Sequence, residues 1–228
     1  MRVYIYLTFL YVIVLVGMYR ALVVLGPLST SLLRYAGDPM QHGYKIFFFT
    51  MPNAPVVYLS FIVVLISSIV YLKTRDSKWD ILAASSAKIG IIFTTILLIS
   101  GAIFSNLAWG AYWNWDPRQT TTLFLWFILA AYLSLRSAID NPQSKARTSA
   151  ILGIFGFVGV PLAHISATIW TSNHPQLYDK VSGAGFKLGN QELITFILMV
   201  MGAIMIYLYL IWITFRTKKM EIFKNGRV

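Results

Sequence analysis

The sequence has no cysteine and few acidic residues or histidines. Its 228 residues include 8 Asp and Glu and 3 His. The absence of cysteine excludes disulfide bonds, thiolate metal sites, cysteine nucleophiles and thiol redox chemistry. The scarcity of acids and histidines leaves no paired carboxylates, no His and acid cluster for a metal ion and no Ser-His-Asp arrangement for hydrolysis.

Charge is also scarce, and apolar residues take its place. Charged residues make up 12% of the chain, hydrophobic residues make up 57%, and the mean hydropathy is +0.68. This composition excludes an ordinary water-soluble domain and indicates an integral membrane protein. The net charge of +11 does not indicate nucleic-acid binding, because the basic residues lie at the ends of apolar runs.

Six apolar runs are each long enough to cross the roughly 30 Å of hydrocarbon in a bilayer as a helix. They cover residues 4–25, 46–72, 81–107, 120–138, 149–170 and 191–215. The first run lacks a small-residue cleavage site and is interpreted as a retained helix. The sequence therefore predicts an all-α membrane protein with six transmembrane helices in a single polytopic domain, residues 1–228.

The loop charges predict the orientation of these helices. One set of loops and termini carries twelve basic residues, and the opposite loops carry five: Arg2, Lys73, Arg75, Lys78, Arg136, Lys145, Arg147, Arg216, Lys218, Lys219, Lys224 and Arg227 against Arg34, Lys45, Arg118, Lys180 and Lys187. The positive-inside rule then places both termini in the cytoplasm, in the plasma or inner membrane. Residues 26–45, the loop after residue 107 and residues 171–190 lie on the outer face. Arg20 and Lys88 fall inside helices and are expected to extend to the nearer interface.

The outer loop at residues 109–120 is rich in tryptophan. Trp109, Trp113 and Trp115 are followed by Asp116 and Arg118. If the first part is helical, Trp109 and Trp113 share one face and Trp115 turns away. Asp116 before a proline predicts the N-cap of the fourth helix. This combination suits a large flat apolar ligand with carboxylates, although a plain aromatic belt at the membrane interface is the alternative for any single tryptophan.

The motif Trp-Gly-x-x-Trp-x-Trp-Asp-x-Arg-x-Thr resembles the "WWD" signature of the CcmC family, the haem-presenting proteins of cytochrome c maturation. Two further segments are similar to that family: Gly43-Tyr44-Lys45-Ile46, and Val160 to His164 leading to Ile169 to His174. The resemblance implies haem b bound as cargo on the extracytoplasmic face, with the tryptophan loop under the macrocycle and His174 as an axial iron ligand. It also implies an extracytoplasmic haem chaperone and an ABC-type ATPase with its membrane subunit as partners. The implied chemistry is coordination and handover, without enzymatic catalysis.

His174 corresponds to the second axial histidine of the family, and the first axial histidine is replaced here. By register its position is Thr50, and a threonine hydroxyl is a poor ligand for haem iron. His42 is ranked first as the substitute, an open or water-bound position second, and Met40 and Met51 are thioether alternatives. His164 is not expected to be the substitute, because it precedes His174 by ten residues along one helix, and two ligands from one helix do not easily bind opposite faces of one ring. It is expected instead to be a buried, hydrogen-bonded histidine of the bundle.

Two other functions stay open at this level. One is a lyase-like enzyme that joins haem to an apocytochrome, which the same signature permits but the short chain disfavours. The other is a transporter whose aromatic loop is only an interfacial belt, and a protein of that kind would bind no haem. For Arg20, contact with a haem propionate is an additional option that no motif supports.

Overall fold

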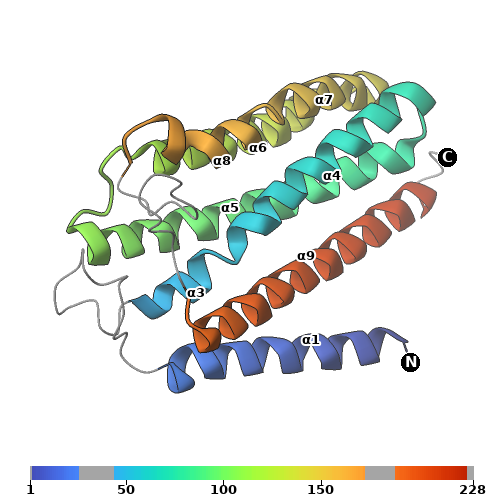
Figure 1. Cartoon of the computed structure of the whole chain (residues 1–228). Helices are drawn as coiled ribbons and strands as arrows, with labels where there is room; N and C mark the ends of the chain where they lie inside the picture. Colours follow the sequence, from blue (N-terminus) through green and yellow to red (C-terminus); the bar gives the residue numbers. More distant parts are fainter. Residues whose placement is uncertain (1, 26–43, 173–187, 225–228) are drawn as a thin grey trace.

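The computed structural model describes residues 2–25, 44–172 and 188–224. All regular structure in these ranges is helical, and six helical spans are long and apolar enough to cross a membrane (Figure 1). The spans are Tyr4–Val24, Phe47–Thr74, Ser77–Trp109, Pro117–Ala138, Pro142–Ile169 and Asn190–Glu221. The predicted all-α architecture with six spans is confirmed.

Several spans consist of more than one helix. The elements in order are α1 (Arg2–Tyr19), the π-helical turn η1 (Arg20–Val24), the short 3₁₀ turn η3 (Tyr44–Ile46), α3 (Phe47–Thr50), α4 (Asn53–Thr74), α5 (Ser77–Trp109), α6 (Pro117–Ala138), α7 (Pro142–Gly156), α8 (Gly159–Ile169) and α9 (Asn190–Lys224). The second span is interrupted near Pro52, and the fifth is interrupted between α7 and α8. Proline and glycine at these breaks account for the interruptions.

Two helices begin earlier than the hydropathy runs predict. Asp76 caps α5 by accepting a hydrogen bond from the Lys78 N–H at 3.0 Å. Asn141 caps α7 through Oδ1, which accepts from two backbone N–H groups, and Pro142 occupies the first turn. Polar residues after these caps are helical because the cap satisfies free donors at the helix start. The two connections are therefore shorter than the polar stretches at residues 73–80 and 139–148, because part of each stretch is helical.

The helices form a bundle around α4 and α5. These two helices pack against each other along their length, with α7 against α4 and α6 against α5 (Figure 1). α8 packs on α6. On the opposite side, α9 packs on α5, and α1 lies along α9. The end of the bundle near α3, α6 and α8 therefore carries the tryptophan loop, and α1 is a peripheral helix.

Small and polar residues allow the central helices to approach closely. A side chain at Gly153 of α7 would place its Cβ 2.8 Å from Cγ1 of Val64, so only glycine fits there. The Ser86 hydroxyl of α5 donates to the carbonyl of Ser60 in α4 at 2.9 Å and lies 2.8 Å from the Tyr207 hydroxyl of α9. Close backbone approach and interhelical hydrogen bonds are the usual means by which membrane helices associate.

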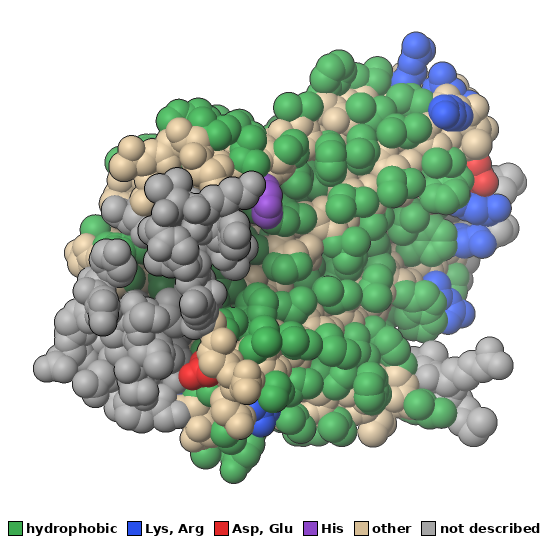
Figure 2. All heavy atoms as spheres, in the orientation of Figure 1, with side chains coloured by type: hydrophobic (Ala, Val, Ile, Leu, Met, Phe, Trp, Pro, Cys, Tyr) green, Lys and Arg blue, Asp and Glu red, His purple; other side chains and the backbone are tan. Residues whose placement is uncertain are grey.

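The two ends of the bundle differ in charge. α1 begins and α9 ends at one end, and the tryptophan loop after α5 lies at the other (Figure 1). Lys and Arg side chains gather at the end that carries the termini, while apolar side chains cover the middle of the visible face (Figure 2). The positive-inside rule assigns the end with more Lys and Arg to the cytoplasm, and the prediction that both termini are cytoplasmic depends on that rule.

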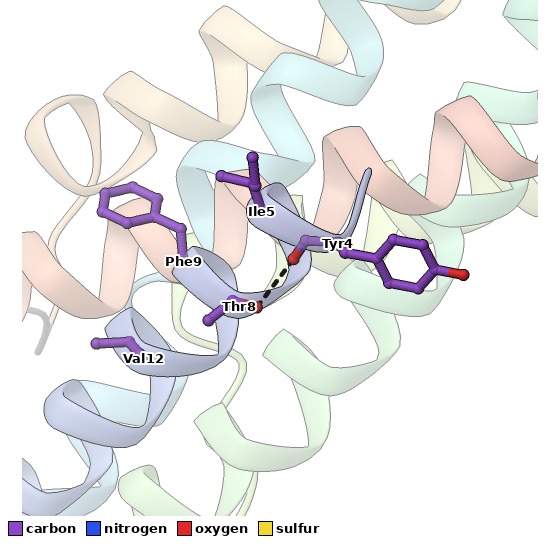
Figure 3. Close-up of a pocket in the computed structure, with 5 residues that line it drawn as sticks. All are labelled: Tyr4, Ile5, Thr8, Phe9 and Val12. Atoms are coloured by element: carbon purple, nitrogen blue, oxygen red, sulfur yellow. Dashed lines mark hydrogen bonds between the residues drawn. The ribbon is translucent and has the colours of Figure 1, made fainter. Parts of the chain in front are cut away.

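A shallow hollow on α1 faces away from the bundle. It is lined by Tyr4, Ile5, Thr8, Phe9 and Val12, and the Thr8 hydroxyl donates to the Tyr4 carbonyl at 2.9 Å (Figure 3). All five residues belong to one helix, and four of their side chains are large and apolar. This surface is therefore a part of the apolar exterior that a bilayer covers.

Candidate functional site

The tryptophan loop begins where α5 ends at Trp109. Gly110 has a φ of +76°, a left-handed conformation that glycine adopts without strain, and its N–H bonds the carbonyl of Asn106 at 2.9 Å. The Ser105 hydroxyl then donates to the Ala111 carbonyl at 2.7 Å, which holds the loop over the last turn. Trp109 and Trp113 therefore do not share one helical face, because this glycine cap ends the helix at Trp109.

Trp109 belongs to a chain of aromatic rings that crosses the bundle. Its ring meets Phe104 edge-on at 5.9 Å, Phe104 lies 6.4 Å from Phe47 of α3, and Phe47 lies 6.0 Å from Phe196 of α9. Edge-on and tilted pairs at these separations stabilise packing beyond the area that they bury. Trp109 is thus half-buried and ties the end of α5 to α3 and α9.

Trp113 and Trp115 form a separate pair at the surface. Their ring centroids are 5.8 Å apart with planes at 88°, so the half-buried Trp113 supports Trp115 edge-on. Trp115 is 73% exposed, and its φ is +58°. A left-handed backbone is rare for a bulky residue, and such strain concentrates at functional sites. The loop therefore holds one indole outward at a conformational cost.

Asp116 fixes the C-terminal end of the tryptophan loop, where α6 begins. It is 5% exposed and caps α6, accepting a hydrogen bond from the Arg118 N–H at 2.9 Å, as its position before Pro117 predicts. Its second carboxylate oxygen accepts a hydrogen bond from the Ser172 hydroxyl at 2.7 Å. This contact joins the start of α6 to the segment after α8, 56 residues further along the chain. Sequence reasoning missed Ser172, because no local pattern pairs it with Asp116.

The first turn of α6 carries polar groups without described partners. Arg118 forms no ion pair within the described residues, and its guanidinium lies within interaction distance of the Tyr58 hydroxyl of α4. Gln119 Nε2 and Thr120 Oγ1 are buried and have no hydrogen-bond partner among residues 2–25, 44–172 and 188–224. Donors at a helix N-terminus suit an anionic group, because the helix dipole adds to their attraction.

The predicted iron ligands are placed only in part. His174 lies in residues 173–187, and His42 and Met40 lie in residues 26–43, outside the described residues. Thr50 is 1% exposed, and its Cγ2 is 3.9 Å from where a Cβ on Gly101 of α5 would lie. Its hydroxyl has no hydrogen-bond partner in the part of the chain that the structure describes. The position of the expected histidine therefore points into the bundle beneath the loop. Met51 is half-buried.

His164 differs from its prediction. Its side chain is exposed, whereas a buried, hydrogen-bonded histidine was expected. Its neighbours Ala163 and Ser166 occupy the buried face of α8, so His164 turns outward, where its ring meets the Tyr58 ring at 6.0 Å and 77°. In addition, α8 ends at Ile169, and Trp170 has an extended backbone with φ −113° and ψ 154°. The assumption of one helix from residue 164 to residue 174 is therefore wrong.

Three basic residues in or next to the first three spans have different surroundings. Arg20, in η1, donates to Gln191 Oε1 at 2.6 Å and to Thr195 Oγ1 at 3.3 Å, both on α9. Lys45 donates to the carbonyl of Leu22 at 2.7 Å. These contacts fix the C-terminal end of the first span to α9 and η3. Lys88 of α5 is exposed.

Comparison with known proteins gives one family. Residues 3–226 match the family model described as Heme exporter protein C. The chain is 29% identical over 174 residues to the Heme exporter protein C of Paracoccus denitrificans, covering 76% of this chain and 72% of that protein. It is 33% identical over 141 residues to that of Bradyrhizobium diazoefficiens, covering 61% of this chain and about half, 54%, of that protein.

A more distant likeness is to the Cytochrome c biogenesis protein CcsA of Oenothera biennis, 38% identical over 81 residues. That alignment covers 36% of this chain and 24% of the plant protein. The match to the Heme exporter protein C model extends over nearly the whole chain, and the six helical spans and the tryptophan loop agree with the resemblance seen in the sequence. The chain belongs to the Heme exporter protein C family.

Proposed function

We propose that this protein binds haem b at the extracytoplasmic face of the plasma or inner membrane and presents it to a haem chaperone during c-type cytochrome biogenesis. It acts as a subunit of a haem delivery complex that includes an ABC-type ATPase and membrane subunits. Haem is the cargo, and the protein's task is coordination and handover. The family and the names of its relatives, Heme exporter protein C, support a role in haem delivery.

The observation that carries the proposal is that an outward-facing indole lies next to hydrogen-bond donors of α6 that have no described acceptor. Trp115 stands on Trp113, and Arg118, Gln119 and Thr120 begin the helix that follows directly. Haem is a flat apolar ring with two carboxylates, so it needs an aromatic surface and a cationic edge side by side. An interfacial belt alone requires no left-handed backbone at Trp115.

Iron ligation is the direct test. Purified protein supplied with haem is expected to show a Soret band, and His174→Ala is expected to lose at least about tenfold in haem affinity, because an axial bond is lost. A wild-type protein without a Soret band would overturn the proposal. An unchanged His174→Ala spectrum would overturn the axial assignment alone. His42→Ala should convert a low-spin spectrum to a high-spin one if His42 is the second ligand.

Substitutions of the exposed Trp115 and the half-buried Trp109 should have different effects, the first on haem binding and the second on the free energy of unfolding. Trp115→Ala is expected to leave the free energy of unfolding within about 0.5 kcal/mol, because the ring is mostly exposed. It should weaken haem binding roughly tenfold through the lost ring contact. Trp109→Ala should instead destabilise the protein by about 2 kcal/mol, because it breaks the aromatic chain to Phe104.

Unfolding in mixed detergent micelles and haem titration measure these two effects on the same samples. Equal losses of stability for Trp109→Ala and Trp115→Ala would contradict the division of roles. Tyr112→Ala, which removes a 61% exposed ring from the same loop, is the matched control. It should change neither quantity appreciably.

A further inference from the structure

An exposed imidazole lies inside a membrane span. His164 belongs to the span Pro142–Ile169, five residues before its end, and its side chain is exposed. Leu162 and Ile165 beside it are each 41% exposed, so its surroundings are apolar. Its contact with the described residues is a ring contact with Tyr58. Polar and ionisable side chains within spans are costly, and they generally have a function or a partner.

Three helices contribute to the surroundings of this imidazole. The His164 ring on α8 stands nearly perpendicular to the Tyr58 ring of α4, with 6.0 Å between centroids. The other end of Tyr58, its hydroxyl, lies beside the guanidinium of Arg118 at the start of α6. The side chains of His164, Tyr58 and Arg118 thus form a row from α8 to the first turn of α6, which directly follows the tryptophan loop.

These three groups match two parts of a haem, the iron at its centre and the propionates at its edge. A neutral imidazole nitrogen is a good ligand for haem iron. Arg118 and the Tyr58 hydroxyl are donors to a carboxylate, and the guanidinium has no described ion-pair partner. The apolar side chains next to His164 suit the body of the macrocycle. A phospholipid headgroup would use Arg118 and Tyr58 but would have no need of an imidazole.

We propose that His164 is a haem-iron ligand on the membrane side of the bundle, with Arg118 and Tyr58 holding a propionate of the same haem. This site rests on the proposed haem-binding function. It also adds an imidazole to a chain that has a threonine, Thr50, where a histidine was expected.

Ligand replacement and rescue test this role in the full-length protein. His164→Gly protein titrated with haem in lipid nanodiscs is expected to show a shifted Soret band and about tenfold weaker binding, and added imidazole should restore the wild-type spectrum. A residue that only supports the fold is not rescued in this way. Ile165→Gly is the matched control, because it makes an equal backbone change at the next exposed position of α8.

Tyr58→Phe provides the second arm, because it keeps the ring against His164 and removes only the hydroxyl. It should weaken haem binding and leave the Soret position unchanged. Haem bound by wild type with an unaltered spectrum in His164→Gly overturns the site while leaving the proposed function intact. A wild type that binds no haem overturns the proposed function and this site together. If zwitterionic and anionic phospholipid nanodiscs differ in haem affinity for wild type but not for Tyr58→Phe, the phenol and guanidinium bind lipid headgroups, and the propionate contact is refuted.

Discussion

Asp116→Ala is expected to lower haem affinity by at least about tenfold, equal to roughly 1.4 kcal/mol, and to destabilise the outer end of the bundle. The carboxylate does two things in the structure. It caps α6, a role that contributes about 1 kcal/mol. It also accepts a hydrogen bond from the Ser172 hydroxyl at 2.7 Å. Its loss frees both Arg118 at the helix start and the segment that leads to His174. Haem titration with thermal unfolding measures both consequences.

Three variants separate the cap from the tie to Ser172. Ser172→Ala removes the tie and keeps the cap, so it should reproduce most of the haem defect with a smaller loss of stability. Asp116→Asn keeps the cap and replaces the charged acceptor, and its defect should be intermediate. Asp76→Ala removes an equivalent cap from α5 at the other end of the bundle and should leave haem affinity unchanged. Normal haem binding by Ser172→Ala would contradict the positioning role.

Asp80→Ala is expected to cost about 3 kcal/mol of unfolding free energy, the largest effect on stability. Asp80 of α5 and Arg136 of α6 form a two-point ion pair, with one contact at 2.8 Å, and each side chain is 16% exposed. The guanidinium also lies 5.8 Å from the centroid of the Tyr132 ring. Removing the carboxylate leaves a largely buried guanidinium without its partner, and that desolvated charge is the source of the cost.

A charge-free double variant tests this reason. Asp80→Leu combined with Arg136→Met removes both charges and should be more stable than Asp80→Ala, because no unpaired charge remains. Glu221→Ala breaks the pair between Lys218 and Glu221, in which both side chains are 54% exposed, and should change stability by less than about 0.5 kcal/mol. Equal effects of Asp80→Ala and Glu221→Ala in denaturant titrations of the micelle-embedded protein would refute the buried pair.

The sequence by itself determined the six spans, the cap at Asp116 and the family. Each of these depends on neighbours along the chain. Hydropathy over about 20 residues decides a span, and a side-chain oxygen next to a helix start decides a cap. The tryptophan motif is also a local pattern, which is why it pointed to the CcmC family before any contact was known. Hydropathy was less exact about where this helix ends: it predicted residue 107, and the left-handed Gly110 ends α5 after Trp109.

Only the tertiary structure decided which way side chains face and which distant residues meet. A bilayer is as apolar as the interior of the bundle, so hydrophobic periodicity does not reveal the buried face of a membrane helix. For that reason His164 was expected inside and lies outside, and the similar tryptophans 109 and 115 have different surroundings. The contact of Asp116 with Ser172 spans 56 residues, and that of Tyr58 with His164 joins two different helices. Such contacts follow from the packing of the helices, which no single segment encodes.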